Sequence, residues 1–183
     1  MGPYHAVMSH FPVALWLTAT LVIVIRVFSD RQLARNLGRV LVPLLALGAV
    51  TGAITFALGF LVWPYEALSA SPLGRNHLLM ASWSLGYWTM LLFIAWRHGE
   101  TLWHGVSRWI ILGLGILGAD LLAITGALGG HLIGNPTMVS DVLRLLGWEV
   151  YTTFYLPTTM LVIIGAAVLA LLAIAIHGRR QPG

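Results

Sequence analysis

The sequence predicts an all-α polytopic membrane protein, a four-helix bundle with a fifth transmembrane helix. Three observations predict this class. Of the 183 residues, 58% are hydrophobic and only 9% are charged, whereas about a quarter of a water-soluble domain is charged. The apolar residues gather in five long runs, and most charged residues lie between the runs. Because so short and apolar a chain leaves little room for a separate soluble domain, we expect residues 1–183 to form a single transmembrane domain.

The five runs are each close to the roughly 20 residues that a helix needs to cross a bilayer. They cover residues 11–28, 40–62, 77–96, 109–128 and 154–176, and the first is compatible with a start as early as Pro3. Two longer connections, Trp63–Asn76 and Gly129–Thr153, lie on one side of the membrane. In the second connection, we expect Ser140 to cap a short interfacial helix that continues to Leu146.

The ten arginines report the orientation, since the chain has no lysine. Only Arg75 and Arg144 lie on the side of the longer connections, and the other eight lie on the opposite side. The positive-inside rule therefore predicts an outer N-terminus and an inner C-terminus. The net charge of +4 is spread around the spans, so it forms no continuous basic face for nucleic acid.

The chain contains no cysteine. This excludes disulfides, thiolate-held iron–sulfur clusters and c-type haem. The sequence also has no H-E-x-x-H, G-x-S-x-G, phosphate-binding glycine loop or paired-carboxylate motif. Hydrolase and nucleotide chemistry are therefore not indicated.

Four of the seven histidines lie near the outer ends of the predicted helices: His5, His10, His77 and His131. Ionisable side chains at membrane depth are usually functional, so we expect this set to bind a metal or cofactor. The alternative is that imidazoles simply favour the interface. The other three histidines lie beside inner arginines, where solvated side chains are expected.

Two helical hairpins, residues 5–66 and 72–135, read as an internal repeat. Residues His10–Trp16 and His77–Trp83 both match H-x-x-x-A-x-W, and Thr-Gly-Ala recurs in the second and fourth spans. Chance similarity between apolar segments is the alternative. If the repeat holds, His10 and His77 lie at equal depth on opposite sides of the bundle.

Haem b is the cofactor that this arrangement favours, because it takes two axial imidazoles from facing helices. His10 with His77 is the preferred pair. His5 and His131 then form a second haem site or hydrogen-bond the haem propionates. Alternatively, the four histidines bind copper or zinc without porphyrin, or the chain is a cofactor-free structural subunit of a larger membrane complex.

Asp120 is the one acid near the middle of a span. It lies about 16 Å deeper than His131 along the same helix, too far to share an ion. Two roles stay open for it: a group for proton transfer or quinone binding, or a helix-packing contact to Thr51, Thr55 or Thr125.

The stretch His5–Leu15 resembles the opening of a bacterial membrane family known as domain of unknown function 2231, whose pattern is H-P-x-x-V-H-F-P-I-A-L. Gly129–Leu132 resembles that family's G-G-E-L, and His77 also fits. The likeness covers about residues 5–135. Two departures are Ala6 in place of proline and His131 in place of glutamate. The resemblance implies a location in the cytoplasmic (inner) membrane of a bacterium. Occasional fusion of the family to Rieske-type or cytochrome domains implies an electron-transfer setting.

Together these features predict a membrane-bound b-type haem protein or oxidoreductase subunit. It is expected to relay electrons between membrane quinol and a periplasmic or membrane redox partner on the outer face. Whether the chain is itself an enzyme stays open.

Overall fold

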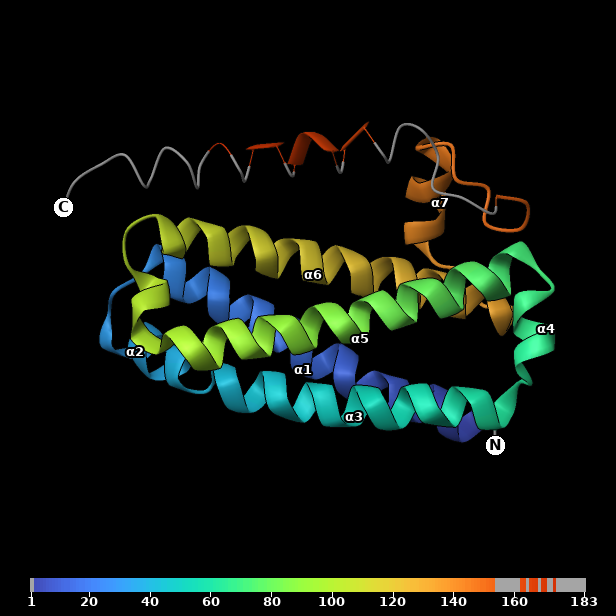
Figure 1. Ribbon diagram of the computed structural model, residues 1–183, viewed down its shortest axis with the longest axis horizontal. Coiled ribbons are helices and arrows are strands. Elements are labelled where there is room, and N and C mark those ends of the chain that lie inside the picture. Colours follow the sequence, from blue (N-terminus) through green and yellow to red (C-terminus); the bar gives the residue numbers. More distant parts are fainter. Residues whose placement is uncertain (1, 154–161, 164, 168, 171–172, 174–183) are drawn as a thin grey trace.

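The computed structural model describes residues 2–153 and the short stretches 162–163, 165–167, 169–170 and 173. Within this part all regular structure is helical, and four long helices dominate (Figure 1): α1 (Gly2–Phe28), α3 (Leu41–Val62), α5 (Pro72–His98) and α6 (Gly105–Leu132). The predicted fifth span, residues 154–176, lies outside the continuously described part.

Four helical stretches are long and apolar enough to cross a membrane: Tyr4–Phe28, Gln32–Val62, Pro72–Trp103 and Gly105–Leu132. Each contains one of the first four predicted spans. The all-α, four-helix part of the predicted fold is thereby confirmed, and the protein is a multi-pass membrane protein.

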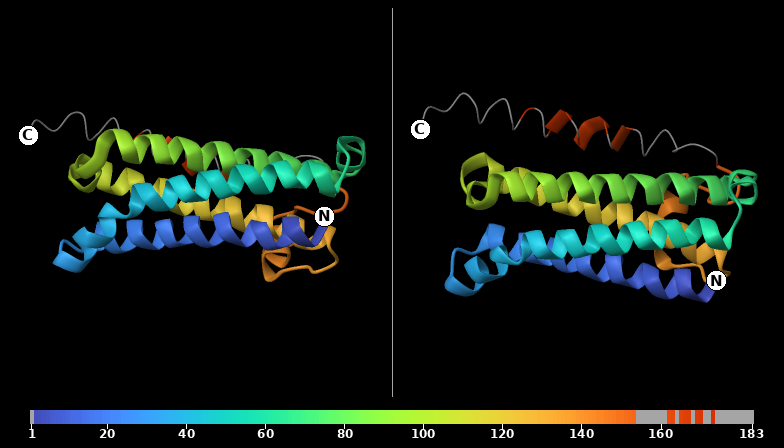
Figure 2. Two further views of the ribbon diagram at one scale, coloured as in Figure 1. Left: turned by 90° about the horizontal axis from the view of Figure 1, so that it is seen from below. Right: turned by 60° about the horizontal axis from the view of Figure 1, so that its bottom comes forward.

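Short helices close the two ends of the bundle (Figure 1). Helix α2 (Gln32–Arg39) and the 3-10 helix η1 (Gly99–Trp103) lie at one end, called here the arginine end. Helices α4 (Tyr65–Ser69) and α7 (Met138–Leu145) lie at the other, called the histidine end. The start of α1 lies at the histidine end in both views of Figure 2.

Local capping explains where the helices of the histidine end begin. Ser71 precedes α5, and its Oγ accepts a hydrogen bond from the Gly74 amide at 3.1 Å, while Pro72 suits the first helical position. Helix α7 starts three residues earlier than expected. Thr137 is its N-cap, and Ser140 instead lies inside the first turn, where its Oγ accepts from the Thr137 amide at 3.2 Å.

The four long helices form a ring in which α1 and α5 lie diagonally opposite. Both of them pack on α3 and on α6. At the centre, the rings of Trp16 and Trp88 stack with centroids 5.4 Å apart and planes 6° apart. Glycines make room for them, because a Cβ at Gly48 would lie 2.2 Å from Trp16 Nε1 and one at Gly118 would lie 2.6 Å from Trp88 Cζ2.

The arginine end is held by a cluster of charges that joins both hairpins. The Asp30 carboxylate pairs with Arg26 of α1 and, at 3.5 Å, with Arg108 of α6. Arg26 is 3% exposed, and its guanidinium lies 5.4 Å from the centre of the Trp103 ring. Arg108 also donates to the Val27 carbonyl oxygen.

Candidate cofactor site

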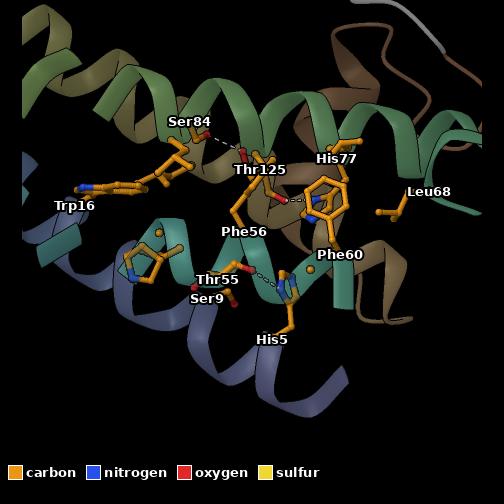
Figure 3. Close-up of a pocket in the computed structure, with 18 of the residues that line it drawn as sticks. His5, Ser9, Trp16, Thr55, Phe56, Phe60, Leu68, His77, Ser84 and Thr125 are labelled. Carbon is orange, nitrogen blue, oxygen red and sulfur yellow. Dashed lines mark hydrogen bonds between the residues drawn. The ribbon is translucent and has the colours of Figure 1, made fainter. Parts of the chain in front are cut away.

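A cavity of about 120 Å³ opens at the histidine end, between α1, α3 and α5, with further contacts from α4 and α6 (Figure 3). Its walls are mostly apolar, and Trp16 of the central stack lines it. Two of the four predicted site residues, His5 and His77, line it from the diagonal helices α1 and α5.

His5 is held by the neighbouring helix of its own hairpin. Its Nδ1 lies 3.0 Å from the carbonyl oxygen of Thr55 in α3. The Trp63 indole meets the imidazole edge to face, with ring centroids 6.0 Å apart. A Cβ at Gly59 would lie 3.2 Å from His5 Cε1, so the ring fits against a helix that lacks a side chain at this position.

His77 is held in the same way by the second hairpin. Its Nδ1 lies 3.2 Å from the carbonyl oxygen of Thr125 in α6, and a Cβ at Gly129 would lie 3.0 Å from His77 Cε1. The Thr125 hydroxyl is also 2.9 Å from the buried Ser84 hydroxyl (Figure 3). The second hairpin therefore has a pair of hydroxyl groups, and one of them belongs to Thr125, whose carbonyl oxygen binds His77.

These contacts fix the tautomer of both histidines. A carbonyl oxygen only accepts hydrogen bonds, so each Nδ1 must carry the proton and donate. Among the described residues neither Nε2 has a hydrogen-bond partner, which leaves its lone pair available to a ligand. Metal-binding histidines commonly have this arrangement, in which the other ring nitrogen donates to a backbone carbonyl.

The two hairpins correspond, but in a different register from the one that H-x-x-x-A-x-W predicts. His5 and Trp16 match His77 and Trp88, each 72 residues later. Trp83, the counterpart expected from the motif, is 51% exposed. The spacings that carry the match are H-x10-W in α1 and α5, and G-x6-T-x3-G in α3 and α6.

His10 and His131 lie away from the cavity. His10 is exposed on α1, with Nδ1 2.7 Å from the Ala6 carbonyl oxygen, so it does not face His77. His131 is 8% exposed, and its Nδ1 is 2.8 Å from the Tyr151 hydroxyl. Its Nε2 is buried without a hydrogen-bond partner. His131 therefore does not share the cavity with His5.

Asp120 lies on the exposed side of α6, and the described residues give it no hydrogen bond or ion pair. The three threonines expected to bind it do not: Thr51, Thr55 and Thr125 each donate to a carbonyl oxygen in their own helix. The packing role expected for Asp120 is wrong for these partners.

The described residues contain no group of three or more His, Asp or Glu side chains placed to hold a metal ion. A pair of imidazoles is what this part of the chain provides.

Comparison with known proteins agrees with the membrane fold and the resemblance of the first helix. No curated protein and no solved structure matches the chain. Residues 1–138, which include His5 and His77, match the family described as Predicted membrane protein (DUF2231). The match ends before the predicted fifth span and covers most of the chain, so the protein belongs to the DUF2231 family of predicted membrane proteins.

Proposed function

We propose that the protein is a membrane electron-transfer component that binds haem b between His5 and His77. The observation that carries this proposal is the matched pair of imidazoles. Each donates its Nδ1 proton to a carbonyl oxygen of the adjacent helix, at 3.0 and 3.2 Å, and each lines the same apolar cavity. Cofactor sites in helical bundles are commonly built from side chains on facing helices.

The donor set supports haem over a bare metal ion. A porphyrin supplies four of the iron ligands, so two protein imidazoles complete the coordination. A structural zinc ion usually needs four protein ligands and a catalytic one three. The described residues offer a pair of histidines and no larger group, which favours haem over the copper or zinc alternative.

The volume of the cavity is a stricter requirement for haem binding than the number of ligands. The cavity of about 120 Å³ is smaller than the roughly 300–1,000 Å³ of common small-molecule sites. Phe56 and Phe60 line it, in edge-to-face contact at 5.3 Å, and Phe60 is 41% exposed. Rotation of these two side chains toward the bilayer is the rearrangement that haem binding requires here.

The protein's own groups would have defined tasks in such a site. The Thr55 and Thr125 carbonyls orient the rings and make the imidazoles better ligands. Apolar walls exclude water, which affects the reduction potential of any bound redox group. Bound haem would supply one-electron chemistry. With the histidine end on the outer side of a bacterial inner membrane, as the arginines predict, electrons would pass from quinol to an outer partner.

The absorption spectrum of the purified protein tests the proposal. We expect a Soret band that is lost in His5→Ala and in His77→Ala. His10→Ala and His131→Ala are matched controls outside the cavity and should keep the band. A protein without a Soret band after haem supplementation would refute haem binding. A Soret band that is kept in His5→Ala but lost in His10→Ala would place the haem site at His10 and outside this cavity.

The small cavity favours a second candidate, a quinol site without haem. Both Nε2 atoms are hydrogen-bond acceptors, and a single ring with two hydroxyl groups can donate one hydrogen bond to each. Trp16 lines the cavity, so a bound quinol analogue should quench its fluorescence. Quenching in haem-free protein that disappears in His5→Ala and His77→Ala would support this candidate, whereas its persistence in both variants would exclude it.

A further inference from the structure

The arginine end carries a regular row of positive charges on α2 and its N-cap. Arg31, Arg35 and Arg39 follow one another at four-residue intervals, which places them along one side of a helix, and all three are exposed. The other side holds α2 against the bundle, because Ala34 is buried and Leu37 packs on the core. We call these three residues the arginine stripe.

The described residues give the stripe no carboxylate partner. Arg35 donates to the Asp30 backbone oxygen and, at 2.8 Å, to Gln32 Oε1, while Arg31 and Arg39 form no ion pair within the part of the chain that the structure describes. The nearby Asp30 carboxylate is engaged by Arg26 and Arg108. The guanidinium groups of Arg31 and Arg39 are therefore left to interact with solvent or with a negatively charged ligand, beside the locally bonded Arg35.

Exposed apolar side chains accompany the stripe. Leu33 within α2 is 71% exposed, and Phe28, just before it, is 65% exposed. Phe28 also meets the half-exposed Trp109 edge to face, with ring centroids 5.8 Å apart. A short helix that combines arginines with exposed leucine, beside tryptophan, is typical of the membrane interface. Both views of Figure 2 show α2 at the end of the bundle, where the bilayer surface would lie.

We propose that the arginine stripe binds the phosphate groups of anionic phospholipids in the leaflet at this end. Guanidinium groups bind phosphate oxygens through paired hydrogen bonds. Leu33 and Phe28 would enter the acyl region beside the bound headgroups. The α2 segment thus acts as a lipid-binding element that sets the depth of the arginine end in the membrane.

Native mass spectrometry of the full-length protein in uncharged detergent tests this, with phosphatidylglycerol and phosphatidylcholine as probes. The test variant is Arg31→Gln/Arg39→Gln, which leaves the locally bonded Arg35 in place. The matched control, Arg75→Gln/Arg144→Gln, also removes two positive charges but at the histidine end. At about fivefold per arginine, phosphatidylglycerol binding should fall roughly 25-fold in the test variant and little in the control.

Arg31→Lys/Arg39→Lys should retain most of the binding, which separates loss of charge from loss of fold. Equal loss in the control variant would overturn the proposal, as would equally tight binding of phosphatidylcholine. A third arm adds inorganic phosphate. If millimolar phosphate displaces phosphatidylglycerol from the wild-type protein, the stripe is a site for free anions rather than for lipid.

Discussion

The two hairpins of the bundle hold their histidines alike but surround them differently. In both, an imidazole donates to a threonine carbonyl oxygen, His5 to Thr55 and His77 to Thr125. The position of Ser84 in α5 corresponds to Pro12 in α1, 72 residues earlier. Only the second hairpin can therefore form a serine–threonine hydroxyl pair there.

The comparison distinguishes the contacts that both hairpins make to their histidine from the contact that only one hairpin makes. The carbonyl contact and the glycine beside each ring, Gly59 and Gly129, occur in both halves. The hydroxyl pair occurs in one. We infer that the orientation of the rings is the shared requirement, and that the hydroxyl pair tunes stability on the His77 side.

The largest effect should come from breaking the central stack that both hairpins share. Trp88 is fully buried, so Trp88→Ala should lower the free energy of unfolding by about 3–5 kcal/mol. Trp83→Ala is the control, because that ring is 51% exposed, and it should cost about 0.5 kcal/mol or less. Unfolding in detergent followed by circular dichroism measures both. Equal losses would mean that the motif register, and not the stacked register, is correct.

The glycines that admit the two indoles give the next largest effect. Gly48→Ala and Gly118→Ala should each destabilise the protein by about 1–3 kcal/mol through overpacking. The first should cost more, because its Cβ would lie 2.2 Å from Trp16, against 2.6 Å from Trp88. Gly86→Ala meets no atom within 4 Å and should be neutral or stabilising. If Gly48→Ala unfolds at the same temperature as Gly86→Ala, the glycines are not required for the stack.

The sequence is sufficient to predict the first four spans but only part of the site. Runs of about 20 apolar residues are a strong signal for spanning helices, because a helix satisfies its backbone groups within one segment in lipid. His5 and His77 are recognisable as candidates. Their pairing is not, because H-x-x-x-A-x-W aligns the halves on His10 and on Trp83, which is exposed. The spacing H-x10-W carries the register, and a spacing of eleven residues keeps two side chains near one helical face.

Other contacts have no local sequence signal. Nothing in the sequence around Arg26 indicates that its side chain is buried, lies beside the Trp103 ring and pairs with Asp30. The acceptors for His5 and His77 are backbone carbonyls, which every residue has, so residue type cannot identify them. The burial of Arg26 and the two histidine contacts both depend on how segments distant in the sequence pack together, and therefore on the tertiary structure.

The hydroxyl pair of the second hairpin should give a smaller effect. Ser84→Ala removes its contact with Thr125 but leaves that hydroxyl donating to the Leu121 carbonyl oxygen. We expect a loss of about 0.6 kcal/mol, the average for such bonds between membrane helices. Ser82→Ala is the control, because its hydroxyl bonds within its own helix. A double-mutant cycle with Thr125→Val measures the coupling, and a coupling of zero would remove the distinction between the hairpins.

The smallest effect concerns Asp30, which links the two hairpins at the arginine end through Arg26 and Arg108. The hydrogen bond from Arg26, with the charge of Arg108, holds the pKa of Asp30 below its ordinary value of 3.8. The folded state thus keeps a carboxylate where the unfolded chain would already bind a proton. The resulting stabilisation is complete above about pH 4 and is lost as pH falls through the folded pKa.

The thermal unfolding temperature, measured from pH 6 to pH 3, should therefore drop less steeply in Asp30→Asn than in the wild type. Asp141→Asn, whose partner Arg144 is an exposed neighbour on the same helix at 3.8 Å, should follow the wild-type curve. Because Asp30 is well exposed, added salt should reduce the difference between the Asp30→Asn and wild-type curves. A difference that salt leaves unchanged would argue against an electrostatic interaction between the hairpins at Asp30.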